Sequence, residues 1–150
     1  MPDEIEITQA SPDRLAQLAP LFDAYRQFYG QPADVAGAKR FLAERLERQD
    51  SVILLACRVD EAIGFSQLYP SFSSVAMRRV WVLNDLFVDP GARRQGVAER
   101  LIRRAIELAR SAGACRLTLA TGVENLPAQQ LYAKQGWSKD EAFAHFNYAL

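Results

Sequence analysis

A strand, a tight turn and an amphipathic helix follow one another in the stretch Leu83–Ile106, and this order constrains the rest of the chain. The apolar, partly β-branched run Val80–Val88 predicts a buried strand. Asp89-Pro90-Gly91 ends that run, because proline cannot donate to a strand ladder and aspartate and glycine favour turns. After the turn, apolar residues recur at helical spacing: Val97, Leu101, Ile102, Ala105 and Leu108.

The turn between this strand and this helix has the composition of a phosphate-binding site. The first N–H groups of a helix have no partner within the helix and lie at the positive end of its dipole, so they attract anions. Gly96 and Ala98 would let a pyrophosphate approach the backbone, and Arg93 and Arg94 add positive charge. Taken alone, the pattern fits an ordinary strand–helix turn with two solvated arginines about as well, because short glycine motifs are weak signals.

Two motifs in the chain resemble those of the GNAT family of acetyl-CoA-dependent N-acetyltransferases. Arg93-x-x-Gly96-x-Ala98 is similar to the family's Q/R-x-x-G-x-G/A signature. Asn125-x-x-Ala128-x-x-x-Tyr132-x-x-x-Gly136-Trp137 resembles the family's second cofactor-side motif in order and spacing. The resemblance covers most of the chain, firmly from Val52 onward and loosely before it, and it implies acetyl-CoA as the cofactor.

Length and composition fit a single domain over residues 1–150, in which 49% of residues are apolar. The 18 basic and 18 acidic residues balance, which argues against a general nucleic-acid binder. The acidic start Met1–Glu4 and the lack of a long apolar run predict no leader and no membrane association. Cys57 and Cys115 lack disulfide or metal spacing, so we expect free thiols, a cytoplasmic protein and no metal site.

The order of predicted elements indicates an α+β (mixed α/β) fold. Strands are expected over residues 4–8, 52–59, 62–69, 80–88, 116–121 and 143–150, and helices over 11–30, 32–49, 96–111 and 125–135. This order resembles the GNAT fold, which implies a twisted, mostly antiparallel sheet of about six to seven strands flanked by about four helices.

The resemblance also implies which residues hold the cofactor. The backbone of the turn would grip the pyrophosphate, through Arg93, Arg94, Gln95, Gly96, Val97, Ala98 and Glu99. The backbone of Leu86, Phe87 and Val88 would pair with the pantetheine arm as another strand would, and an amide there would polarise the thioester carbonyl. Asn125, which also suits a helix N-cap, and Ala128 would contact the pantetheine.

Tyr132 is the candidate acid for the thiolate leaving group. A phenol with a pKa of about 10 can give a proton to a thiolate of similar basicity with little mismatch. By helical spacing alone Tyr132 would more often pack on the core, and the complete motif from Asn125 to Trp137 favours the catalytic role.

Asn84 and Asp85 interrupt the otherwise apolar strand. An unpaired buried carboxylate is costly, so Asp85 needs a reason to be there. Strand alternation puts the two residues on opposite faces unless a bulge intervenes. The stretch resembles the diamine acetyltransferase branch, in which a Glu-Asp pair stands here, so Asn84 replaces the usual acid. Asp85 could be the base, bind a cationic amine, or form a structural ion pair with a residue such as Arg79.

The acceptor site is predicted around Tyr29, Trp81 and Asn84, among other aromatic residues that could bind a cation through their π faces or simply pack. We expect direct attack on acetyl-CoA by a small primary amine in a ternary complex, since no Ser or Cys nucleophile with a base partner is evident. The alternatives are a protein lysine or N-terminus as acceptor, or a non-catalytic acyl-CoA-binding regulatory module. The resemblance also implies a homodimer.

Overall fold

The computed structural model describes residues 4–150, and positions 1–3 of the predicted acidic start lie outside the described residues. The chain forms two compact units, one ending at Ala120 and one beginning at Thr121. Within the described part of the chain, no helix combines the length and the apolar character needed to cross a bilayer.

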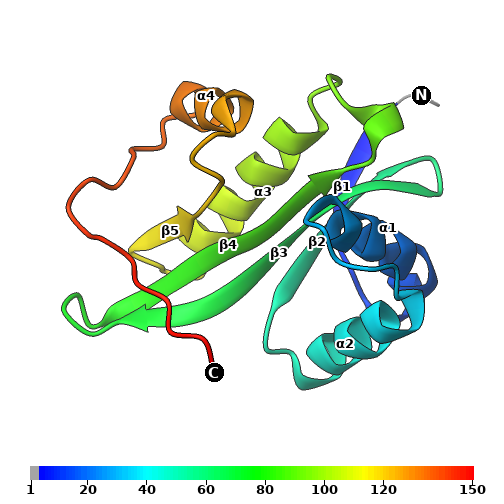
Figure 1. The fold of residues 1–150 in the computed structure, drawn as a ribbon, viewed down its shortest axis with the longest axis horizontal. Helices are drawn as coiled ribbons and strands as arrows, with labels where there is room; N and C mark the ends of the chain where they lie inside the picture. Colours follow the sequence, from blue (N-terminus) through cyan, green and yellow to red (C-terminus); the bar gives the residue numbers. More distant parts are fainter. Residues whose placement is uncertain (1–3) are drawn as a thin grey trace. The chain divides into compact units, whose positions relative to one another are not determined.

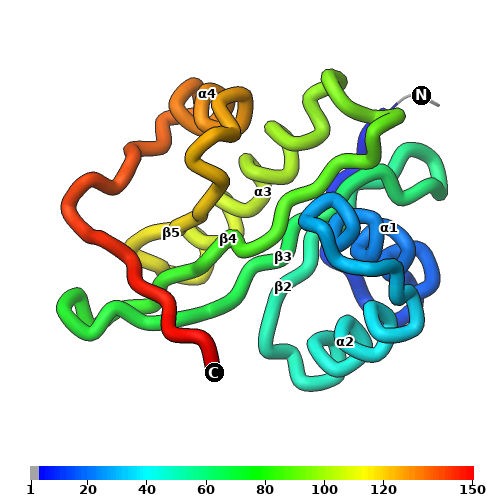
Figure 2. Tube along the Cα trace, in the orientation of Figure 1, coloured from blue at the N-terminus to red at the C-terminus, as the bar shows by residue number. Residues whose placement is uncertain are grey.

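The first unit is built on a mixed sheet of five strands, counted over residues 4–150, in the order β1-β2-β3-β4-β5 (Figure 1). The strands are β1 Ile5–Gln9, β2 Val52–Arg58, β3 Glu61–Ser73, β4 Arg78–Val88 and β5 Arg116–Leu119. Strands β1 to β4 pair antiparallel, and β5 pairs parallel to β4. Figure 2 shows β3 and β4 running side by side to the turn at residues 74–77.

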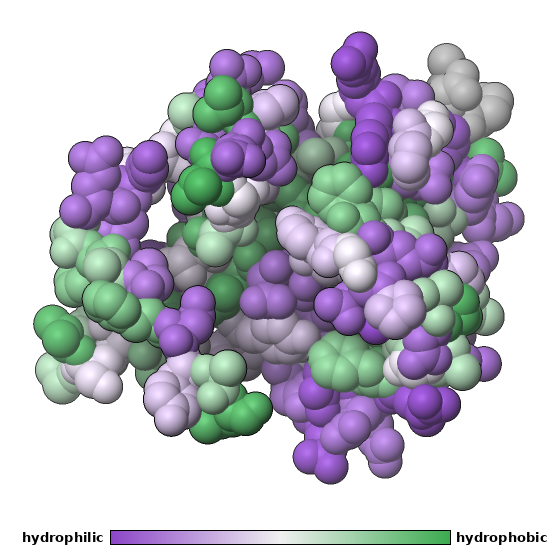
Figure 3. Space-filling view, viewed as in Figure 1, coloured by the Kyte–Doolittle hydropathy of each residue, from purple (hydrophilic) through white to green (hydrophobic). Residues whose placement is uncertain are grey.

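Two helices cover one face of this sheet and a third covers the other. Helices α1 (Leu15–Phe28) and α2 (Val35–Arg48) bury a core that includes Leu18, Leu42 and Phe65. Helix α3 (Val97–Ser111) lies on the opposite face, so close to β3 that a Cβ added at Gly64 would lie 3.2 Å from the Val97 side chain. The outer side of α2 is charged, and the lower right of Figure 3 is correspondingly hydrophilic.

Asp23 fixes the path of the chain between α1 and α2. Its buried carboxylate accepts hydrogen bonds from the Asp34 N–H at 3.1 and 3.2 Å, from Arg26 at 2.8 Å and from Gln27 at 3.1 Å. Burial alone would raise the pKa of Asp23, but these hydrogen bonds and the Arg26 charge outweigh it and hold the pKa below its usual value. The end of α1, which carries the predicted acceptor residue Tyr29, is thereby anchored to the start of α2.

The second unit contains one helix, α4 (Leu126–Lys134), among its residues 121–150. The Asn125 side chain caps α4 by accepting a hydrogen bond from the Ala128 N–H at 3.2 Å. Residues 137–150 form no helix or strand.

The predicted α+β class, four helices and mostly antiparallel sheet are confirmed, but two strand predictions were wrong. The segment 143–150 is not a strand, so the sheet has five strands instead of six or seven. Its apolar residues alternate, yet Phe146 is 92% and Tyr148 89% exposed, so no buried face stabilises a strand there. Strand β3 runs past the predicted end at Tyr69 despite Pro70, because β2 pairs with β3 only as far as Leu68 and proline is tolerated at a free edge.

Candidate functional site

A β-bulge in β4 decides which way Asp85 faces. Gln67 of β3 pairs with Asp85 and the next residue, Leu68, pairs with Leu83, so Asn84 is an extra residue with no partner opposite. The alternation of side chains is therefore reset after Leu83. Asp85 faces α1 and α2, together with Gln67, and Asn84 is exposed.

Asp85 is 8% exposed and is held by two neighbouring side chains. The Asn84 side-chain amide donates to both carboxylate oxygens at 3.1 Å, and Tyr25 of α1 forms a second side-chain hydrogen bond. Burial raises the pKa of Asp85, and the hydrogen bonds from Asn84 and Tyr25 offset part of that rise. A carboxylate whose pKa is raised by burial is suited to accept a proton.

Aromatic residues of α1 place Tyr29 in the same region as Asp85. The Tyr25 ring packs edge-on against Phe65 and Phe87, with centroid distances of 5.5 and 5.8 Å, and this packing fixes the direction of its hydroxyl. Tyr29 stacks edge-on against Tyr25 at 5.1 Å and is 59% exposed. The structure thus brings together Tyr29, Asn84 and Asp85, three of the predicted site residues.

Trp81 lies on the other face of β4. Strand register pairs Trp81 with Pro70 and Arg79 with Phe72, and the Arg79 guanidinium stacks over the rings of Phe72 at 4.3 Å and Trp81 at 5.9 Å. Trp81 is therefore not grouped with Asp85. The ion pair between Asp85 and Arg79, one of the alternatives raised from the sequence, does not form within residues 4–150.

The edge of β4 that faces β5 is only partly paired. Strand β5 pairs with Val80–Leu83 and ends at Leu119. Leu86, Phe87 and Val88 continue to pair with β3 on their other edge, opposite Ser66, Phe65 and Gly64. Within the first unit, the backbone of residues 86–88 thus has an edge that β5 leaves open, as pairing with an extended ligand would require.

The turn before α3 leaves the start of that helix without a side-chain cap. Gly96 is the N-cap residue, with φ +79°, and as a glycine it provides no side-chain cap for the helix. Arg94 also adopts a left-handed conformation, with φ +62°. A Cβ added at Gly96 would meet no atom within 4 Å, so the space beside this residue is open. These features suit a bound anion.

Arg93 is held against the protein rather than extended over this turn. Its Nε donates to the Val88 carbonyl at 3.0 Å, and its guanidinium lies 5.8 Å from the Phe28 ring centroid and 5.6 Å from that of Phe87. Arg93 and Arg94 are both exposed, and because Arg93 is engaged by these contacts, Arg94 is the charge more available to a ligand in this turn.

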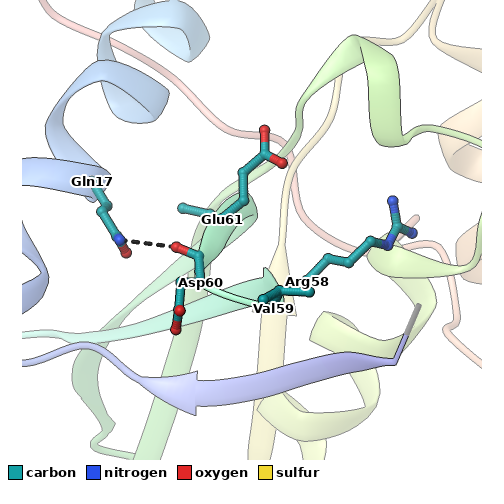
Figure 4. A pocket seen from close by; sticks show the side chains of 6 residues that line it. Gln17, Arg58, Val59, Asp60 and Glu61 are labelled. Carbon is teal, nitrogen blue, oxygen red and sulfur yellow. Dashed lines mark hydrogen bonds between the residues drawn. The ribbon is translucent and has the colours of Figure 1, made fainter. Parts of the chain in front are cut away.

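A hollow at the β2–β3 hairpin adjoins the same turn. It is lined by side chains that include Gln17, Arg58 and Glu61 (Figure 4). Gln17 reaches from α1 to the Asp60 carbonyl at 2.9 Å. Arg58 extends from the end of β2 and donates to the Gln95 side chain, so this hairpin supports the turn. The hollow contains none of the residues around Asp85.

The second unit carries Asn125, Ala128 and Tyr132, in and next to α4. Tyr132 is half-buried, with its ring centroid 6.0 Å from that of Trp137. The backbone N–H of Trp137 donates to the backbone carbonyl of Tyr132 at 3.0 Å, and this hydrogen bond closes the end of the helix. The second motif therefore folds as one local piece of structure.

Sequence reasoning missed Gln67, which faces Asp85 from the neighbouring strand. The available signal was a glutamine in the run Ile63–Leu68, all of whose other members except Ser66 are apolar or glycine. The sequence does not show which residue of β4 lies opposite Gln67, so it could not indicate that Gln67 is a neighbour of Asp85.

Comparison with known proteins identifies the family of the chain. The sequence profile of the acetyltransferase (GNAT) family matches residues 18–137. An uncharacterized N-acetyltransferase of Bacillus subtilis (strain 168) is 48% identical over 142 residues, which cover 95% of each chain. The crystal structure of a probable acetyltransferase superposes with a TM-score of 0.92, at 43% identity and with 97% of each chain covered. Aminoglycoside N(6')-acetyltransferase type 1 of Serratia marcescens is 30% identical over 99 residues, which cover 59% of this chain and 68% of that protein. The chain therefore belongs to the acetyltransferase (GNAT) family, whose enzymes use acetyl-CoA as the acyl donor.

Proposed function

We propose that this enzyme moves the acetyl group of acetyl-CoA to a primary amine of a small molecule, by direct attack in a ternary complex. The observation that carries the proposal is the buried carboxylate of Asp85, turned toward α1 by the bulge and bonded to Asn84 and Tyr25. An amine nucleophile must lose a proton, and a carboxylate whose pKa is raised by burial is suited to take it.

Acetyl-CoA supplies the acetyl group as a thioester. On the donor side, the uncapped first turn of α3 would bind the pyrophosphate, with Arg94 adding charge and Arg58 and Gln95 steadying the turn. The open backbone edge of residues 86–88 would hold the pantetheine arm. We assign Asn125 and Ala128 to the same arm by their place in the family motif.

On the acceptor side, the amine would approach Asp85 past Tyr29 and Asn84. The exposed face of Tyr29 can bind the cationic form of the amine through its π electrons. Asp85 would then receive a proton from the amine nitrogen as the new N–C bond forms. The aminoglycoside acetyltransferase among the relatives supports an amine of a small molecule as the acceptor. Tyr132 is proposed as the acid that protonates the departing thiolate.

The test is release of CoA from acetyl-CoA in the presence of a panel of amines. The panel runs from spermidine and putrescine to amino acids, aminoglycosides and lysine peptides, with no-acceptor and no-enzyme controls. Asp85→Asn should lower kcat by about 10²- to 10⁴-fold on the best acceptor, whereas Asp13→Asn, at an exposed position, should leave it unchanged.

Two results would contradict the proposal. Turnover of a lysine peptide alone would make a protein the acceptor. Tight binding of acetyl-CoA with no turnover on any amine would favour the regulatory module, for which Asn84 in the place of an acid is the supporting feature.

We further propose that the two units act as one catalytic domain, because the family match at residues 18–137 runs through both. A homodimer in the cytoplasm is proposed on the same kinship, with the free thiols of Cys57 and Cys115 suiting a reducing compartment. Sedimentation velocity at micromolar protein concentration should give the mass of two chains, and a single chain would contradict the dimer.

A further inference from the structure

Gln67 carries a buried polar atom that the structure leaves unused. The residue is 0% exposed and lies in the middle of β3. Its Nε2 donates to the Ser51 hydroxyl at 3.0 Å. Its Oε1 is buried and accepts no hydrogen bond within the described part of the chain. Buried acceptors are almost always satisfied, so an open one points to a donor that is present in another state of the protein.

Asp85 is the residue directly opposite Gln67. The two are register partners on neighbouring antiparallel strands, and their side chains share the face that α1 and α2 cover. Side chains so paired have Cβ atoms about 4.5–5.5 Å apart, well within the combined reach of a glutamine and an aspartate.

The hydrogen bonds of Asp85 differ between its two protonation states. As a carboxylate it accepts from Asn84 and Tyr25, as the structure shows. Once it gains a proton, the new O–H group needs an acceptor. The Asn84 amide nitrogen cannot accept, and the Gln67 Oε1 is an acceptor without a donor.

We propose that Gln67 is a positioning residue whose Oε1 receives the hydrogen bond of protonated Asp85. The inference deepens the proposed function and rests on it in one respect, namely that Asp85 is the base. When the amine attacks, its N–H bond breaks, the Asp85 O–H bond forms, and that O–H then donates to Gln67. The proton leaves to solvent when the carboxylate is restored.

Among the groups around Asp85, Gln67 offers a buried acceptor that has no donor in the part of the chain that the structure describes. From α1 the facing group is Tyr25, and from the same bulge it is Asn84. From β3 it is Tyr69, whose pKa is raised to about 12 by burial first and by the charge of Asp85 second. Arg45 of α2 and Asp50 form an ion pair at 2.9 Å, and their charges act on Tyr69 with opposite signs. A neutral amide on β3 can therefore shift the balance between the two forms of Asp85.

The test is a direct titration of Asp85 by NMR, with its side-chain carboxyl carbon labelled with ¹³C. Gln67→Met keeps the length of the side chain and removes both polar atoms. It should lower the titration midpoint of Asp85 by about one pH unit, because the acid form loses its acceptor. The acid limb of the pH profile of kcat/KM should move down by the same amount. Ser51→Ala removes the bond to Nε2 and keeps Oε1, so it should leave both midpoints in place.

A second measurement needs no change at Gln67. In the unmodified protein, the side-chain amide resonances of Gln67 should shift with the same midpoint as Asp85, and this shift should vanish in Asp85→Asn. Gln67 resonances that ignore the Asp85 titration would overturn the inference. An Asp85 titration midpoint that is unchanged or higher in folded Gln67→Met would also overturn it. A higher midpoint would mean that the Gln67 amide donates to the Asp85 carboxylate in the unmodified protein. The NMR titrations of Asp85 and Gln67 do not depend on turnover. Failure of the amine panel and failure of this inference can therefore be told apart.

Discussion

Two adjacent polar side chains, Asn84 and Asp85, lie at the bulge of β4 and have different environments. Asn84 stays exposed and donates to both oxygens of Asp85, which is buried. An acid in the place of Asn84 would put a second negative charge beside Asp85 and remove its donor. Asn84 is therefore compatible with a single buried base, so the acid that the diamine acetyltransferase branch has at this position is not required for the proposed role of Asp85.

Tyr132 can be tested at the same scale, because one oxygen atom carries its proposed role. Tyr132→Phe should lower kcat by about 10²-fold or more while the Kd for acetyl-CoA stays within about twofold, since only the proton for the thiolate is lost. The ring keeps its packing at 6.0 Å from Trp137. The matched control is Tyr148→Phe, at a residue of the same unit that is 89% exposed, and it should leave kcat unchanged. An unchanged kcat in Tyr132→Phe would remove this tyrosine from the mechanism.

Most elements could be predicted from the sequence because their boundaries depend on local chemistry. The strand Val80–Val88, the turn at Asp89-Pro90-Gly91 and the helix after Gly96 all form as expected. What depended on pairing could not be predicted. The bulge at Asn84, the face of Trp81 and the partner of Gln67 follow from a register shift between two strands, and no property of either strand alone reveals it.

The start and end of α3 allow a matched test of the cofactor turn. Gly96 and Gly113 both have left-handed backbones, with φ +79° and +72°, and a Cβ at either meets nothing within 4 Å. Alanine at either position should cost about 1 kcal/mol of stability through backbone strain. Only Gly96→Ala should also raise the Kd for CoA by about tenfold or more, because its methyl group occupies the approach to the helix N–H groups.

Thermal unfolding would measure the strain, and calorimetric titration with CoA would measure the affinity. Equal CoA affinity in the two variants would show that the pyrophosphate does not approach the backbone at Gly96.

At the scale of the whole molecule, the sequence predicts one domain, whereas the structure separates into two compact units. The second unit has one short helix and a long stretch without regular structure, so it buries little apolar surface by itself. Four of its large apolar residues are exposed, namely Phe143, Phe146, Tyr148 and Leu150. Such a segment cannot offset the entropy cost of its own ordering, which is the physical reason to expect its folding to depend on the first unit.

The two tryptophans of the chain provide a direct test, because Trp81 lies in the first unit and Trp137 in the second. In Trp137→Phe the fluorescence reports the first unit, and in Trp81→Phe it reports the second. If the chain is one cooperative domain, the fluorescence midpoint of each variant should coincide with its own far-UV circular dichroism midpoint in a urea titration. CoA should raise the free energy of unfolding by the same amount in both variants, since a ligand stabilises every part of the chain that unfolds together with its binding site. A Trp137 transition at lower urea than the loss of helix would instead show that the second unit unfolds alone. The role proposed for Tyr132 would then be available only in the fraction of molecules in which that unit is folded.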